Sequence, residues 1–217
     1  MTNTPPLHLT ISPTAWHPAF VQAFQLELEQ YRTVLEFIPE FQLTSEPLRI
    51  DLAVIRKLKD VPIEKNIAAI FRSDNLVEYK SPDDHLSVED FYKMYGCACL
   101  YASMKKLAIR EITMSFVVSR KPVKLLKHLQ EARKYRIRVE SPGICQVEGD
   151  IVPIQIIDRR ELAVEENLWL KGLGKDLEAA AMAAILKGSS EKLGEMEIKA
   201  YLDVILRRNV EIFMEVG

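Results

Sequence analysis

Cysteine and long apolar runs are both scarce in this sequence. The three cysteines, Cys97, Cys99 and Cys145, are odd in number and form no Cys-x-x-Cys pair, so reduced thiols are the simplest interpretation. No apolar run approaches the roughly 18 to 20 residues that a membrane helix needs. Residues 1–13 lack a basic segment followed by an apolar stretch, so no secretory signal is expected there. These absences predict a cytoplasmic protein with no membrane partner.

Two common ligand-binding patterns are also missing. The four histidines are scattered without the spacing of metal ligands, so a zinc site is not expected. The segment 172–175, Gly-Leu-Gly-Lys, lacks the spacing and the Ser/Thr of a phosphate-binding loop, and a helix boundary is its expected role. The composition, 48% hydrophobic and 28% charged, is typical of a globular protein.

The length of 217 residues allows one full hydrophobic core and an appended subdomain. Helical and strand-like patterns alternate up to about residue 158, whereas the chain from Glu161 onward reads as helical throughout. We therefore expect a mixed domain over 1–158 and a helical C-terminal extension over 159–217.

The net charge of −2 is unevenly distributed. Residues 119–138 carry eight cations against one acid, whereas residues 140–217 carry fifteen acids against nine cations. One local basic face is enough to bind nucleic acid even when the whole chain is slightly acidic. The candidate nucleic-acid-binding residues are Arg120, Lys121, Lys124, Arg136 and Arg138. A solvated helix face remains the alternative interpretation of the lysines at 124 and 127.

The order of expected elements indicates a mixed α/β fold. Apolar residues at helical spacing predict a helix over 18–37, and apolar runs predict strands over 41–44, 49–57, 75–81 and 112–119. Ser87 and Asp90 mark the expected start of a helix that runs to about residue 106. Further elements are expected as a helix over 122–134, strands over 135–140, 145–147 and 152–157, and helices over 175–186 and 195–208. Together they predict an antiparallel meander extended by a crossover, with helices on both faces of the sheet.

Three ionisable residues stand inside the expected strands. Glu78 and Lys80 are two residues apart and therefore share one face, while Val77 and Tyr79 point to the other face. If the strands over 49–57 and 75–81 are antiparallel, Asp51 meets this pair at the same end of the sheet. Buried carboxylates are costly unless they are paired or bind a metal.

The chemistry of such a cluster suits a hard cation. Two carboxylates match the oxygen ligands that Mg²⁺ prefers, and a neighbouring lysine can orient water and stabilise charge that develops on phosphorus. The pattern therefore predicts metal-dependent phosphodiester hydrolysis. An ordinary ion pair between Lys80 and Glu78 or Asp51 at the sheet end is the alternative.

Three segments together resemble a known superfamily. Residues 49–55 (RIDLAVI), 77–84 (VEYKSPDD) and 91–96 (FYKMYG) resemble the PD-(D/E)xK nucleases, in particular the recombination-promoting nuclease and putative transposase group. The resemblance covers roughly the first 120 residues and implies a restriction-endonuclease-like mixed sheet core. Ile50 stands where the proline of the superfamily's name would be, and no Gln follows at the helix position that one branch uses.

The resemblance also implies roles for individual residues. It assigns Asp51 and Glu78 to the metal, Mg²⁺ or Mn²⁺, and Lys80 to the attacking water, in a DNA endonuclease of recombination or mobile-element type. An acid on the first helix often completes the site, for which Glu27 is the first candidate and Glu29 the next. The alternative is an inactive nuclease-fold protein that binds nucleic acid or another protein. In that case a homodimer assembled through the exposed residues 212–214 is the expected form.

Overall fold

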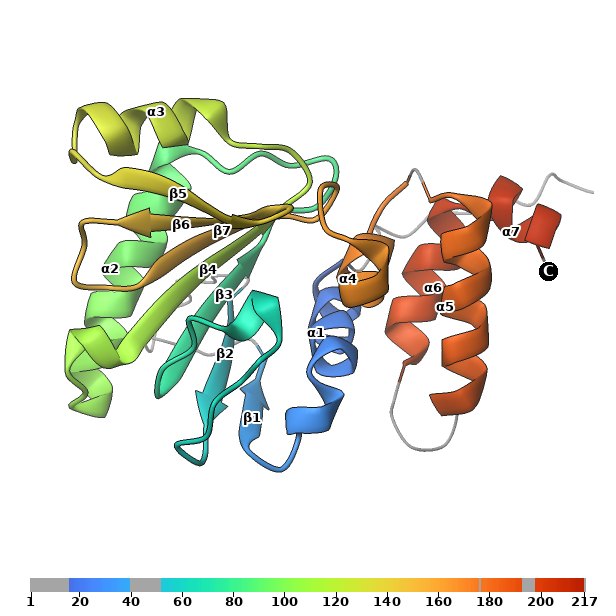
Figure 1. The fold of residues 1–217 in the computed structure, drawn as a ribbon, viewed down its shortest axis with the longest axis horizontal. Coiled ribbons are helices and arrows are strands. Elements are labelled where there is room, and N and C mark those ends of the chain that lie inside the picture. The colour runs from blue at the N-terminus through green and yellow to red at the C-terminus, as the bar shows by residue number, and fades with distance from the viewer. Residues whose placement is uncertain (1–15, 40–51, 176, 193–197, 217) are drawn as a thin grey trace, which may run out of the picture.

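The computed structural model describes residues 16–39, 52–175, 177–192 and 198–216. In this part of the chain, seven strands form one mixed sheet in the order β1-β2-β3-β4-β7-β6-β5 (Figure 1). The strands are β1 (Leu35–Ile38), β2 (Leu52–Lys57), β3 (Asp74–Tyr79), β4 (Ile112–Val118), β5 (Arg136–Ser141), β6 (Ile144–Glu148) and β7 (Ile154–Asp158).

Helices cover both faces of this sheet. The α-helices are α1 (Trp16–Glu27), α2 (Val88–Lys105), α3 (Val123–Glu131), α4 (Val164–Gly172), α5 (Ala179–Lys192), α6 (Lys199–Arg208) and α7 (Val210–Val216), and short 3₁₀ turns cover Glu29–Tyr31, Asn66–Ala68 and Ile109–Glu111. Figure 1 shows α2 and α3 on one side of the sheet, and α1 between the other side and the C-terminal helices. The expected α/β protein with a helical C-terminal region is confirmed. Every helix in the described residues is too short or too polar to cross a bilayer.

The sheet is antiparallel at both sides and parallel in the middle. β1, β2 and β3 form the expected antiparallel meander, and α2 then crosses over so that β4 pairs parallel to β3. β7 also pairs parallel to β4, and β6 and β5 extend the sheet with antiparallel pairing. All residues of β3 and of β4 are buried, as expected for central strands covered on both faces.

Alternate residues of β3 contribute to two separate cores. Val77 and Tyr79 belong to the core that includes α1 and the C-terminal helices. Leu76 belongs to the core beneath α2 and α3. Because side chains alternate along a strand, Glu78 lies on the same face as Leu76, the face that α2 covers. The expected opposition of Glu78 to Val77 and Tyr79 is therefore confirmed.

One predicted element has a different form in the structure. The helix expected over 18–37 ends at Glu27, and residues 35–38 form β1 instead, paired antiparallel to β2. Leu35 is buried in the same core as Phe24 and Leu28. Its apolar side chain therefore continues the helical pattern of the sequence although it lies on a strand. Pairing with β2 satisfies the backbone and outweighs the local helical pattern. The strand expected over 41–44 lies outside the described residues.

The start of α2 carries the capping pattern that the sequence indicates. Ser87 accepts a hydrogen bond from the Asp90 backbone N–H at 3.0 Å, and the Asp90 carboxylate accepts one from the Ser87 backbone N–H at 2.9 Å. Two backbone donors at the helix start are thus satisfied reciprocally. The predicted helix start at Ser87 is confirmed.

Ser87→Ala is expected to lower the free energy of unfolding by about 1 kcal/mol, the usual cost of losing an N-cap side chain. Chemical denaturation of the variant and of wild type measures this difference. Ser103→Ala, at an exposed position near the end of the same helix, is the matched control and should change stability little. Equal losses in the two variants would contradict the capping role.

The residues proposed for self-assembly in α7 differ in exposure. Met214 is 76% exposed, whereas Ile212 and Phe213 are partly buried against the core that includes α1. Of the three residues proposed for self-assembly, only Met214 is therefore exposed.

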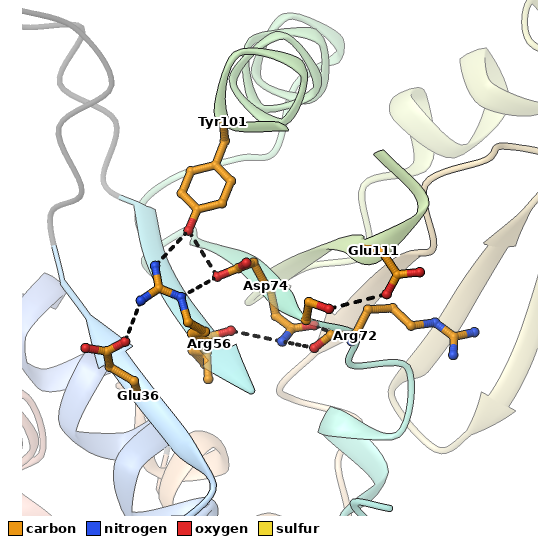
Figure 2. A network of polar contacts seen from close by, with 9 residues as sticks. Glu36, Arg56, Arg72, Asp74, Tyr101 and Glu111 are labelled. Carbon is orange, nitrogen blue, oxygen red and sulfur yellow. Dashed lines mark hydrogen bonds and ion pairs between the residues drawn. The ribbon is translucent and has the colours of Figure 1, made fainter. Parts of the chain in front are cut away.

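A network of hydrogen bonds and ion pairs connects the amino end of β3 to β1, β2 and α2 (Figure 2). Arg56 on β2 contacts Asp74 on β3 at 3.0 Å and Glu36 on β1 at 2.7 Å. The Tyr101 hydroxyl on α2 donates to the same Asp74 carboxylate at 3.0 Å. The network links three strands and a helix at the sheet edge opposite the one that carries Lys80.

Candidate active site

Glu78 and Lys80 lie together at the carboxyl end of β3. Glu78 is the next-to-last residue of the strand, and Lys80 follows the strand directly, its backbone N–H donating to the Val117 carbonyl of β4 at 2.9 Å. The Lys80 Nζ lies 3.2 Å from Glu78 Oε1. The expectation that these two side chains share a face is confirmed.

Asp90 on α2 completes this cluster, although its sequence pattern indicates only the start of a helix. The Lys80 Nζ donates to Asp90 Oδ1 at 2.9 Å, while Asp90 Oδ2 accepts from the Ser87 hydroxyl at 2.8 Å. The helix cap therefore fixes the carboxylate that holds Lys80. The available signal was the position of the capping acid ten residues after Lys80, at the start of the helix that follows β3.

Burial and charge act in opposite directions on these three groups. Burial raises the pKa of the Glu78 carboxyl, and the nearby Lys80 charge offsets this only in part. Burial alone would lower the pKa of Lys80, but the hydrogen bond and charge of Asp90 and the charge of Glu78 outweigh it and raise that pKa. Burial of Asp90 is likewise outweighed by its hydrogen bonds to Ser87 and Lys80, so its pKa is lowered. Lys80 is thus a charged ammonium at neutral pH.

Glu27 lies elsewhere in the fold. Its Oε1 accepts hydrogen bonds from the backbone N–H groups of Trp169 at 2.7 Å and Leu170 at 3.0 Å, and its Oε2 contacts Lys65 Nζ at 2.7 Å. Burial raises the pKa of Glu27 despite these partners. Because α1 covers the sheet face opposite the one that carries Glu78, the structure does not bring Glu27 into the predicted metal set.

The two other predicted metal-binding acids are Asp51 and Glu29. Asp51 lies outside the described residues, and the first described residue of β2, Leu52, pairs with Glu78. Glu29, the second first-helix candidate, forms an ion pair with Lys192 of α5. It therefore contacts the C-terminal helices and not the Glu78 cluster.

The described residues bring two carboxylates to this end of β3. Glu78 and Asp90 supply carboxylate oxygens on either side of Lys80. No group of three His, Cys, Asp or Glu side chains suited to a metal ion occurs within the described ranges. Mg²⁺ keeps several waters and commonly takes only one or two carboxylates from the protein, so Glu78 is compatible with such an ion.

The predicted basic residues fall into two sets. Arg136 and Arg138 lie on the edge strand β5, where both contact Glu148, at 2.6 Å and 2.7 Å. Arg138 also contacts Glu140 at 2.5 Å, so nearby carboxylates neutralise much of the positive charge of the two arginines. Arg120 and Lys121 instead are exposed directly after β4, and Lys124 is exposed in the first turn of α3. The structure therefore places the second set, and not Arg136 or Arg138 in the first half of β5, at the edge that carries Lys80.

The fold and this cluster define an α/β protein with a polar site at the carboxyl ends of its parallel strands. Comparison with family models, with curated proteins and with solved structures finds no match for the chain.

Proposed function

We propose that this protein is a metal-dependent DNA endonuclease whose site is built around Glu78 and Lys80. The observation that carries the proposal is the cluster at the end of β3, where a buried carboxylate and a charged ammonium lie 3.2 Å apart on one face. The described order of α1, β1, β2, β3, α2 and β4, with its meander and crossover, agrees with the resemblance found in the sequence.

Each residue has a distinct part in the proposed reaction. Glu78, together with Asp51, would hold Mg²⁺ or Mn²⁺, which when bound polarises phosphoryl oxygens and stabilises negative charge. Lys80 donates hydrogen bonds and stabilises charge that develops on the scissile phosphate. The contacts of its ammonium with Glu78 and Asp90 hold it in place for this electrostatic role. Asp90 positions the Lys80 ammonium.

A second candidate function rests on the same contacts. Lys80 is already held by two carboxylates, an arrangement that also suits a structural ion pair. Under this alternative the chain keeps a nuclease-like fold but acts as a nucleic-acid-binding or protein-interaction module. The two candidates differ in whether the protein takes up a divalent ion and cleaves DNA.

Incubation of supercoiled plasmid with the wild-type protein tests the first candidate. Nicked and linear DNA are expected with Mg²⁺ or Mn²⁺, and EDTA should abolish them because the carboxylates alone cannot stabilise the transition state. Asp51→Ala should likewise abolish cleavage. Cleavage that persists in EDTA, or in the Asp51→Ala protein, would contradict the proposed site.

Titration calorimetry with Mn²⁺ separates the two candidates without DNA. The nuclease proposal expects heat of binding in wild type and its loss in Asp51→Ala. A wild-type protein that takes up no divalent ion favours the binding module.

A further inference from the structure

A basic hollow of about 230 Å³ opens at the carboxyl ends of the three parallel strands. Its lining comes from four separate segments: Pro82 and Asp83 after β3, Ser119 and Arg120 after β4, Arg159 and Arg160 after β7, and Lys175 after α4. Four of these seven side chains are cationic and one is acidic. Of these four cations, only Arg120 is among the nucleic-acid-binding residues expected from the sequence.

The topology makes this edge a natural position for a ligand. After β4 the chain continues into α3, which belongs to the core on one face of the sheet, and after β7 it continues into α4, which belongs to the core on the other face. In open sheets with parallel strands, the connections that leave for opposite faces create a crevice at the carboxyl ends of the strands. Arg120 and Arg159 stand at the two sides of this crevice.

Arg159 forms a fixed part of the hollow. It is only 3% exposed, its Nε donates to the Ser119 hydroxyl at 2.9 Å, and its Nη1 donates to the Lys171 carbonyl at 3.3 Å. Its backbone N–H donates to the Val118 carbonyl of β4 at 2.9 Å. A guanidinium held in this way contributes a fixed positive charge to the hollow, and such a charge attracts a phosphate group.

The cations around the hollow lower the pKa of an acid that lines it, Asp83. Asp83 is exposed, yet its pKa is lowered by its hydrogen bond to Lys175 and by the charges of Lys175, Arg208 and Arg120. Cations from three separate segments thus act on one surface carboxylate. An incoming anion would experience the same field.

The hollow adjoins two others of similar size. One, of about 280 Å³, shares Arg159 and Arg160 with it, and the other, of about 270 Å³, shares Lys175. Among the described residues, the charged ones that line the three hollows are the cations Arg120, Arg159, Arg160, Lys171, Lys175, Arg207 and Arg208, and the acids Asp83, Glu178 and Glu211. These seven cations and three acids form a basic track that runs from the sheet edge to the C-terminal helices, and within it Arg207 is also paired with Asp203 at 2.8 Å.

We propose that this track binds the phosphodiester backbone of DNA, with the hollow around Arg159 and Arg160 as its central phosphate site. The inference rests on the proposed function for the identity of the nucleic acid, and it adds the surface that would hold the strand. Phosphate oxygens are the usual partners of arginine and lysine in such interfaces. The track lies close to the Lys80 cluster along the chain, because only Ser81 separates Lys80 from Pro82 and Asp83.

Binding of fluorescein-labelled duplex DNA of about 20 base pairs, followed by anisotropy in EDTA from about 50 to 200 mM salt, tests this inference. The test variant is Arg120→Ala/Arg160→Ala/Lys175→Ala, which leaves the buried Arg159 in place. We expect its affinity to fall by at least about tenfold and the slope of log K against log salt to decrease by about 3, one unit for each lost phosphate contact.

The matched control removes three exposed cations away from the track, in Lys59→Ala/Arg110→Ala/Lys187→Ala. Lys59 and Arg110 lie at the opposite edge of the sheet, after β2 and before β4. This variant should keep most of the wild-type affinity, and unfolding temperatures verify that both proteins fold. Equal affinities or equal losses in the two variants would overturn the inference.

The binding assay also separates this inference from the nuclease proposal. Loss of binding in the track variant, without plasmid cleavage by wild type, supports the track and contradicts the nuclease. Cleavage by wild type together with undiminished binding by the track variant supports the nuclease and contradicts the track. A wild-type protein that does not bind DNA overturns the track.

Discussion

Glu78→Gln is expected to abolish Mg²⁺-dependent DNA cleavage while the protein stays folded. The amide has nearly the same shape as the carboxyl, but it carries no negative charge to hold a divalent ion. Burial already raises the pKa of Glu78, so loss of the buried charge removes a desolvation cost as well as the ionic attraction to Lys80, to which the amide oxygen can still accept a hydrogen bond. Plasmid cleavage and thermal unfolding, measured on the same preparation, separate the effect on activity from the effect on the fold.

Two further variants define how the site would work. Lys80→Met should reduce the cleavage rate by about 10²- to 10³-fold, the usual loss when one electrostatic stabiliser of a transition state is removed. Glu89→Gln, an exposed acid beside Asp90 on α2, is the matched control and should cleave like wild type. Wild-type rates in Glu78→Gln or in Lys80→Met would show that the cluster is a structural ion pair.

Arg56→Met should lower the free energy of unfolding by about 3 kcal/mol, the low end of the cost of leaving a buried charge without its ionic partner. The Asp74 side chain is only 5% exposed, and Arg56 is the cation that contacts it at 3.0 Å (Figure 2). Tyr101 would remain as a hydrogen-bond donor to the carboxylate, but it carries no charge to compensate it. Urea denaturation of wild type and variant measures the difference.

Glu36→Gln is the control for this second result. Glu36 contacts the same arginine at 2.7 Å, but its side chain is 46% exposed. Solvent-exposed ion pairs contribute only about 0 to 1 kcal/mol, so this variant should lose much less stability than Arg56→Met. Similar losses in both variants would show that burial of Asp74 does not govern the network.

The central strands were predictable from the sequence because their apolar runs leave few alternatives. Residues 112–118 of β4 are nearly all apolar, and the strand is buried on both faces as expected. The capping pair of Ser87 and Asp90 is a local signal, so the start of α2 was predictable as well. The end of α1 was not, because helical spacing continues past residue 27 and only pairing with β2 makes Leu35 part of a strand.

The candidate site was predictable only where its geometry is local. Two residues in the same strand must share a face, so the approach of Glu78 to Lys80 followed from their spacing. Which face of the sheet α1 covers depends on tertiary packing, which the sequence does not indicate. The prediction therefore placed Glu27 beside Glu78, whereas in the structure Glu27 contacts Trp169 and Lys65. Docking of α2 against the sheet likewise brings Asp90 to Lys80, so the position of the capping acid after β3 becomes informative only once that docking is known.

The basic track was missed because its residues are dispersed along the chain. Arg120 and Arg160 come after different strands, and Arg160 and Lys175 lie within residues 140–217, where acids outnumber cations. The signal that could have found them is the position of Ser119-Arg120 and Arg159-Arg160, each directly after an apolar strand. Recognition of β4 and β7 as parallel neighbours would have placed both arginine-containing pairs at one edge.

A crystal structure of the protein with Mn²⁺, with the ion located by its anomalous scattering, tests the central claim most directly. The account predicts an ion coordinated by the Glu78 and Asp51 carboxylates, with the Lys80 ammonium beside it. An ion bound elsewhere, or no ion at Glu78 while Lys80 stays held between Glu78 and Asp90, would contradict it.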